Sequence, residues 1–147
     1  MISIMKKINT ISRCAVAYRN DVLKDKTLTP LYHSYVIIVS KNPGISQEEL
    51  ANKLCINKSN VTRGLSNLEE QGYVERKVDT KDKRVLKVYP TDKMLDALPK
   101  VKAALRDWNK YLTDDIDKEE IEIFQSVLER ITQKAKDYMD NRAEDAL

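Results

Sequence analysis

The sequence has few of the residues on which enzymes and metal proteins usually depend. It contains one histidine, two cysteines and three glycines in 147 residues. The cysteines, Cys14 and Cys55, make neither a disulfide framework nor a set of zinc ligands, and His33 alone cannot hold a metal ion. There is also no glycine-rich phosphate loop and no pair of nucleophile and base. We therefore discount an enzyme and expect no metal and no cofactor.

Long apolar runs are also missing. The longest, Tyr35 to Val39, has five residues, whereas a membrane helix needs about 20. Near the N-terminus Lys6 and Lys7 precede a stretch that polar residues interrupt, which is not typical of a secretory signal. These features predict a cytoplasmic protein with reduced cysteines and no membrane association.

Charge is abundant but unevenly placed. Charged residues make up 33 % of the chain and the net charge is +3. Residues 57–89 carry eight bases against five acids, while residues 114–147 carry five bases against eleven acids. This asymmetry favours a basic surface for a polyanion and an acidic surface turned away from it. A salt-laced surface without a partner would give a similar composition.

Apolar residues recur at helical spacing over most of the chain. They predict helices over about residues 3–23, 30–40, 46–54, 57–71 and 92–113, and a last helix from residue 117. Several starts carry capping signals: Thr29 before Pro30, a capping box of Ser46 and Glu49, and Asn57. Two short strands are predicted over about residues 73–78 and 84–89. The fold class is therefore mainly α with a small β-hairpin.

The segment from residue 46 to residue 71 is typical of a helix-turn-helix, because a short helix, a sharp turn and a second helix follow one another. Ala51 is expected to let the helices approach, and Leu50, Leu54, Ile56 and Val61 are expected to fill the space between them. The second helix and its cap then carry small, polar or basic side chains suited to base edges and phosphates in a major groove. These are Asn57, Lys58, Ser59, Asn60, Thr62, Arg63, Ser66 and Asn67. A solvated helix face is the alternative, but such a face usually mixes acids with bases along its length.

The hairpin that follows makes the motif a winged helix. Its tip carries Lys81, Lys83 and Arg84, and a basic wing can enter a minor groove. Asp79 and Asp82 lie among these bases. We interpret them as wing-shaping residues: Asp79 would accept backbone N–H bonds in the turn, and Asp82 would pair with Arg84 or Arg63.

Residues 46–91 closely resemble the multiple-antibiotic-resistance regulator (MarR) family. "NVTRGLSNLEEQGYVER" is similar to the recognition helix and first wing strand of that family, and "DTKDKR" is similar to its wing signature Asp-x-Arg-Asp-x-Arg. Lys81 stands where the family usually has arginine, which keeps the charge but lacks the planar fork. The helix order on both sides also fits, so the resemblance covers nearly the whole chain.

The resemblance implies a homodimer that binds double-stranded DNA. Residues 1–40 and 92–147 would supply the N- and C-terminal helices of the dimerisation domain, and residues 41–91 the winged helix-turn-helix. The expected function is sequence-specific transcription regulation, as a ligand- or oxidant-responsive repressor on a pseudo-palindromic operator. The alternative is a winged-helix protein-interaction module that does not bind DNA.

The resemblance further implies a sensing site for a small aromatic or phenolic effector, or for an oxidant. Cys14, Tyr18 and His33 are the candidates for this role. Each also has an ordinary interpretation, because a lone histidine, a scattered tyrosine or a helical cysteine more often packs in a core.

Overall fold

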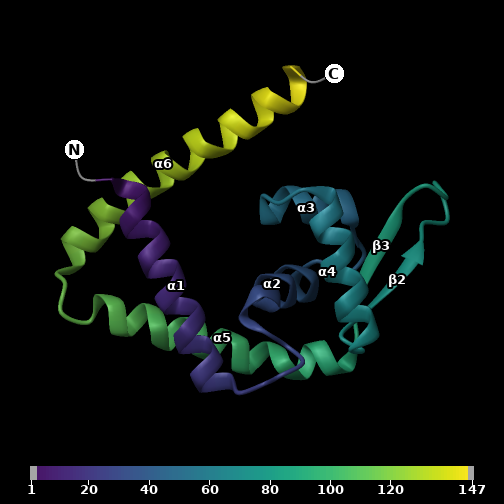
Figure 1. Cartoon of the computed structure of the whole chain (residues 1–147), viewed down its shortest axis with the longest axis horizontal. Helices are drawn as coiled ribbons and strands as arrows, with labels where there is room; N and C mark the ends of the chain where they lie inside the picture. Colours follow the sequence, from purple (N-terminus) through teal and green to yellow (C-terminus); the bar gives the residue numbers. More distant parts are fainter. Residues whose placement is uncertain (1–2, 146–147) are drawn as a thin grey trace. The chain divides into compact units, whose positions relative to one another are not determined.

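The structure, a computed structural model, describes residues 3–145 (Figure 1). The chain divides into two compact units, the first running to Trp108 and the second starting at Asn109. No helix in the described part is long and apolar enough to cross a membrane.

The helices follow the predicted order. They are α1 (Ile4–Leu23), the short 3₁₀ helix η1 (Pro30–Tyr32), α2 (His33–Lys41), α3 (Gln47–Leu54), α4 (Lys58–Glu70), α5 (Asp92–Thr113) and α6 (Lys118–Asp145). One helix start differs from the prediction: η1 comes first, α2 begins only at His33, and the Thr29 side chain makes no capping hydrogen bond. Proline at the first position favours the tight turn but does not itself fix an α-helical continuation.

The sheet has one strand more than the sequence predicted. The hairpin of β2 (Val74–Val78) and β3 (Leu86–Pro90) is joined by the two-residue strand β1 (Ile45–Ser46), which pairs antiparallel with β3. Two residues are too few to show an alternating pattern, so β1 had no sequence signal. Because Ser46 also caps α3, this strand fixes the start of the helix-turn-helix to the wing.

The core of the first unit lies between α2, α3, α4, the sheet and the first half of α5. Its fully enclosed hydrophobic side chains are Val36, Val39, Leu50, Val61, Leu65, Leu68, Tyr73, Val74, Val88, Met94 and Val101. Figure 1 shows the β2–β3 hairpin extending beyond the α3–α4 pair. The core therefore holds one face of α4 and leaves the opposite face and the hairpin tip in solvent.

The helices at the two ends of the chain differ from this core. No residue of α1 is buried, and none is buried over the part of α6 from residue 118 to residue 142. Both helices nonetheless carry large apolar side chains that are about half exposed or more, among them Ile4, Ile11, Ile123, Phe124 and Tyr138.

Candidate nucleic-acid interface

The start of α4 is held by local hydrogen bonds that the sequence predicts. In α3 the Ser46 hydroxyl accepts from the Glu49 amide at 3.1 Å, and Glu49 Oε2 accepts from the Ser46 amide at 2.9 Å. The helix ends at Leu54, and the residue that caps it, Cys55, has a left-handed φ of 54°. The Asn57 side chain then accepts from the Asn60 amide at 2.8 Å and caps α4. The sharp turn and the cap together set the direction in which α4 leaves the motif.

One face of α4 is buried and the other is open. Val61, Gly64, Leu65 and Leu68 face the core. Every residue predicted to contact DNA on this helix and its cap is exposed, namely Asn57, Lys58, Ser59, Asn60, Thr62, Arg63, Ser66 and Asn67. The prediction for Ile56 was wrong: its side chain is 37 % exposed and lines a surface pocket instead of the helix-turn-helix core.

The polar side chains of this face are partly ordered by one another. Lys58 Nζ lies 3.0 Å from Glu48 Oε1 of α3, in an ion pair that is exposed on both sides. Arg63 Nη2 donates to Asn60 Oδ1, and the Thr62 hydroxyl donates to the Lys58 carbonyl at 2.9 Å. Exposed pairs of this kind are weak, so Lys58 and Arg63 can exchange these partners for a phosphate or a base edge.

In the wing, Asp82 holds Arg84. Asp82 Oδ1 accepts from the Arg84 amide at 3.0 Å and from Nε at 3.1 Å, and Oδ2 accepts from Nη2 at 3.2 Å. These bonds with Arg84 lower the pKa of the Asp82 carboxyl. The guanidinium is thereby held in one direction while the side chain of Arg84 stays 91 % exposed.

The other aspartate contributes differently from what the sequence suggested. No bond to the Asp79 carboxylate occurs within residues 3–145; instead the backbone N–H of Asp79 donates to the Val85 carbonyl at 2.9 Å. The turn is closed from within by the Asp82 carbonyl, which accepts from the Val85 amide at 3.0 Å. Lys81 and Lys83 are both exposed at the tip. The bases expected to enter a minor groove are therefore free to do so.

Arg76 of β2 was not singled out from the sequence, yet it makes more side-chain bonds than any predicted contact residue. It donates to Glu69 through its backbone N–H, Nε and Nη2 at 2.9, 3.1 and 2.8 Å. Nη2 also donates to Ser66 Oγ at 3.2 Å and Nη1 to Gln47 Oε1 at 3.4 Å. The contact with Arg76 lowers the pKa of the Glu69 carboxyl.

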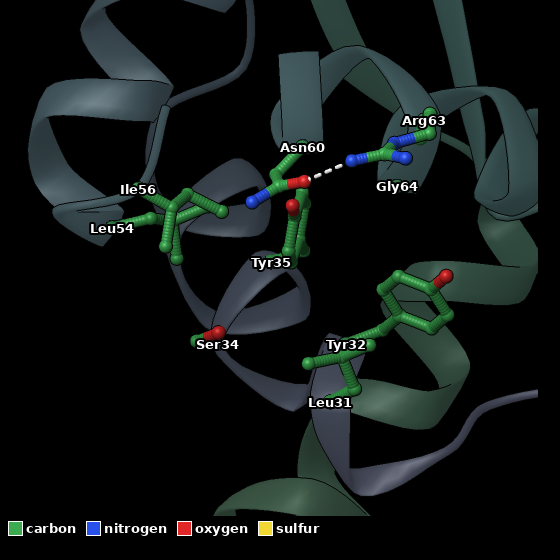
Figure 2. A pocket seen from close by; sticks show the side chains of 9 residues that line it. All are labelled: Leu31, Tyr32, Ser34, Tyr35, Leu54, Ile56, Asn60, Arg63 and Gly64. Atoms are coloured by element: carbon green, nitrogen blue, oxygen red, sulfur yellow. Dashed lines mark hydrogen bonds between the residues drawn. The ribbon is translucent and has the colours of Figure 1, made fainter. Parts of the chain in front are cut away.

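A surface pocket of about 470 Å³ lies beside the recognition helix (Figure 2). Tyr32 and Tyr35 come from η1 and α2, with ring centroids 5.6 Å apart in an edge-to-face arrangement. Asn60, Arg63 and Gly64 of α4 form the facing wall. Two residues predicted to contact DNA, Asn60 and Arg63, thus also line a cavity with an aromatic wall.

The three sensing candidates lie in different environments. His33 is 1 % exposed, and its ring nitrogens make no hydrogen bond of normal geometry. Burial, followed by the charge of Arg19, lowers the pKa of His33, while the Leu28 backbone and Asp25 oppose the shift. The packing interpretation was wrong for Cys14, which is exposed. Tyr18 stacks on Trp108 with centroids 5.0 Å apart.

Three similarities to known proteins bear on this site. The model of the MarR family matches residues 28–86, which include α2, the helix-turn-helix, β2 and the wing turn. The helix-turn-helix-type transcriptional regulator YybA of Bacillus subtilis (strain 168) is 28 % identical over 131 residues, covering 89 % of this chain and 87 % of YybA. The crystal structure of the transcriptional regulator SlyA superposes with a TM-score of 0.87 at 26 % identity, covering 92 % of this chain and 95 % of SlyA.

The chain belongs to the MarR family. It is a DNA-binding, helix-turn-helix transcriptional regulator of that family, with the winged fold that the sequence predicted. This membership also agrees with the expectation that the protein is not an enzyme. A Listeria monocytogenes protein assigned to the MarR family and solved with a 26mer DNA has the same fold, with a TM-score of 0.82 at 24 % identity over 93 % of this chain and 91 % of that one.

Proposed function

We propose that this MarR-family protein is a cytoplasmic repressor that binds a pseudo-palindromic operator as a homodimer. The observation that carries the proposal is the open face of α4, whose exposed hydrogen-bonding side chains lie next to a basic wing ordered by Asp82. The Listeria monocytogenes protein with this fold was solved with DNA, which supports the same use of α4 here. In a dimer, two such units would meet successive major grooves roughly 34–36 Å apart.

Burial supports the domain roles that we propose. Residues 41–91 would bind DNA, and residues 1–40 and 92–147 would supply the dimer helices. The support is the unburied apolar surface of α1 and α6, since long amphipathic helices are stable only when such a stripe is covered.

The operator is best identified by selecting bound duplexes from a random-sequence DNA library. We expect the selected sequences to contain an inverted repeat with half-sites about one helical turn apart. An absence of DNA binding at low salt would favour the alternative, a winged-helix module that binds a protein.

Arg63 and Lys83 should then behave differently. Arg63→Ala should cost about 1–3 kcal/mol and relax the preference at one position per half-site, if its contact is to a base. Lys83→Ala should weaken binding to all DNA sequences more evenly. It should also reduce the slope of the logarithm of the binding constant against the logarithm of the salt concentration by about 1. Equal effects of the two variants on specific and random duplexes would contradict base readout by Arg63.

Repression would respond to a small aromatic or phenolic effector. The pocket beside α4 supports this, because a planar ligand could pack on Tyr32 and Tyr35 and reach Arg63. The buried His33 and the half-buried Arg19 offer a second polar environment, because the ring nitrogens of His33 and the enclosed Nε of Arg19 make no hydrogen bond of normal geometry. A panel of hydroxybenzoates should weaken binding to the selected duplex; if none does, and none changes the thermal midpoint of the free protein, the effector is of another class.

Oxidant sensing would act through Cys14, which is exposed on α1 and far in sequence from the DNA-binding motif. Cys14→Ser is expected to bind the selected duplex like the wild type and to lose any response to hydrogen peroxide. A Cys14→Ser protein with an intact fold but no DNA affinity would show that this separation of roles is wrong.

A further inference from the structure

Arg76 occupies an unusual position for a base in a DNA-binding motif. Its side chain is only 17 % exposed, compared with 73 % for Lys58 and 91 % for Arg84. The guanidinium donors that make hydrogen bonds point inward, toward the end of α4 and the start of α3. A residue so enclosed is poorly placed to neutralise a phosphate, although its charge and its place in the winged helix would suggest that role.

The partners of Arg76 come from both helices of the helix-turn-helix. Glu69 and Ser66 lie one turn apart on the second half of α4, and Gln47 is the first residue of α3. The guanidinium donates to all three, and two of its nitrogens bind the same Glu69 oxygen. One side chain of strand β2 therefore joins the wing to the recognition helix and to the helix before it.

The network is also continuous with the sheet. Arg76 pairs with Val88 of β3 in the ladder, and Val88 pairs with Ile45 of β1. Ile45 is followed by Ser46, which caps α3. The row Arg76–Val88–Ile45 thus connects the Arg76 guanidinium to the backbone at the start of the helix-turn-helix. A shift of the wing would therefore have to break the charge-assisted bonds of Arg76 or the hydrogen bonds of the sheet.

We propose that Arg76 is a positioning residue, which through Glu69, Ser66 and Gln47 fixes the wing relative to the recognition helix and makes no contact with DNA itself. This rests on the proposed function only in that the fixed geometry serves DNA binding. Simultaneous insertion of α4 into a major groove and of the wing into the adjacent minor groove requires this relative position before binding, since ordering it on the DNA would cost affinity.

The first test measures the distance between the recognition helix and the wing in the absence of DNA. Spin labels are attached at Ser59→Cys and Lys81→Cys in a Cys14→Ser, Cys55→Ser protein, and labelled protomers are diluted with unlabelled ones. All four sites are exposed. Pulsed electron resonance should give one narrow distance distribution, which Arg76→Gln and Glu69→Gln broaden.

Lys77→Gln is the matched control: it removes the same charge from the same strand, but its ion pair with Glu75 is 63 % and 61 % exposed. An equally narrow distribution in Arg76→Gln would overturn the proposal.

The second test uses the duplex selected by the wild type. Glu69→Gln removes an acid from the DNA-binding helix, so an electrostatic effect alone predicts tighter binding. Positioning predicts binding weaker by at least about threefold, and non-additivity when Glu69→Gln is combined with Arg76→Lys. Glu70→Gln, its exposed neighbour, should bind slightly tighter.

Arg76→Lys separates charge from geometry. It keeps the positive charge but loses the fork that reaches three partners. Full affinity in Arg76→Lys, or tighter binding in Glu69→Gln, would overturn the proposal. Failure of the wild type to bind any duplex would instead refute the proposed function and leave the distance measurement as the test of positioning.

Discussion

At the residue scale, acids do as much as bases to define the DNA-binding surface. Asp82 directs Arg84 and closes the wing turn, and Glu69 engages Arg76. In both cases hydrogen bonds to a carboxylate restrain a guanidinium and hold it in one direction. The net charge of the motif is therefore a poor guide to its affinity for DNA, because some of its basic side chains are paired with acids and order the structure.

The Asp82→Ala variant tests this for the wing. It removes a negative charge, so a purely electrostatic wing predicts tighter DNA binding. We expect weaker binding, because Arg84 loses the three bonds that hold its guanidinium and backbone in place. Titration of the selected duplex at several salt concentrations measures the effect, and tighter binding at every concentration would show that the aspartate does not order the wing.

His33 makes stability depend on pH. Its pKa is lowered from 6.5 in the folded chain, chiefly by burial. Below about pH 6.5 the unfolded chain therefore binds a proton that the folded chain excludes, so this contribution is present above pH 6.5 and is lost as the pH falls toward the folded pKa. We expect the free energy of unfolding to fall as the pH is lowered below about 6.5.

His33→Gln provides the control, because His33 is the only histidine in the chain. Chemical denaturation at a fixed protein concentration should show that the variant has lost this pH dependence, whatever its stability at pH 7.5. An unchanged slope in His33→Gln would assign the effect to another group.

At the scale of elements, the close approach of α4 to α2 depends on a missing side chain. A Cβ on Gly64 would lie 2.7 Å from the Tyr35 hydroxyl oxygen and 3.0 Å from Cζ of that ring. Tyr35 is 3 % exposed and packs edge-on against Tyr32, so it has little room to move. Glycine at this position lets the recognition helix lie directly on the tyrosine.

Gly64→Ala sets two effects against each other. Alanine is favoured over glycine inside a helix by about 1 kcal/mol, whereas overpacking of a core costs about 1–3 kcal/mol. We expect a net loss of about 1 kcal/mol, measured by urea denaturation.

Tyr35→Phe removes the atom in closest conflict, so the double variant Gly64→Ala, Tyr35→Phe should recover stability relative to the sum of the single changes. Strict additivity would show that the hydroxyl is not the obstacle.

At the scale of the whole molecule, α1 and the part of α6 up to residue 142 carry apolar side chains of which none is buried. Ile8, Leu128 and Ile131 are half-buried and Ile11 is 48 % exposed. Such surface is unfavourable in water, and a second copy of the chain would cover it. We predict a homodimer whose interface includes Ile8, Ile11, Leu128 and Ile131.

Sedimentation of the full chain should give the dimer mass at micromolar concentration. Leu128→Glu should shift the protein toward monomer, because it places a charge in the predicted interface. Gln133→Glu adds the same charge on the opposite side of α6, where Gln133 already bonds the exposed Asp137, and should stay dimeric. A monomeric wild type would refute the predicted assembly.

The sequence by itself determined most of the elements and the type of motif. Capping residues such as Ser46 and Asn57, and apolar spacing such as Val61, Leu65 and Leu68, act between neighbours within a few residues. Their physics is local, so it can be read in order along the chain. The wing signature likewise led to the family, and the Asp82–Arg84 contact spans only two residues.

Only the tertiary structure decided which polar groups meet across elements. The strand β1, the Arg76–Gln47 bond, the Lys58–Glu48 pair and the burial of His33 each join residues that are distant in sequence or depend on how helices pack. Side-chain pairing of this kind is set by the relative placement of packed elements. Local propensity carries no information about that placement. Burial decided the roles in the same way: among bases of similar charge in residues 57–89, packing encloses Arg76 and leaves Arg84 in solvent.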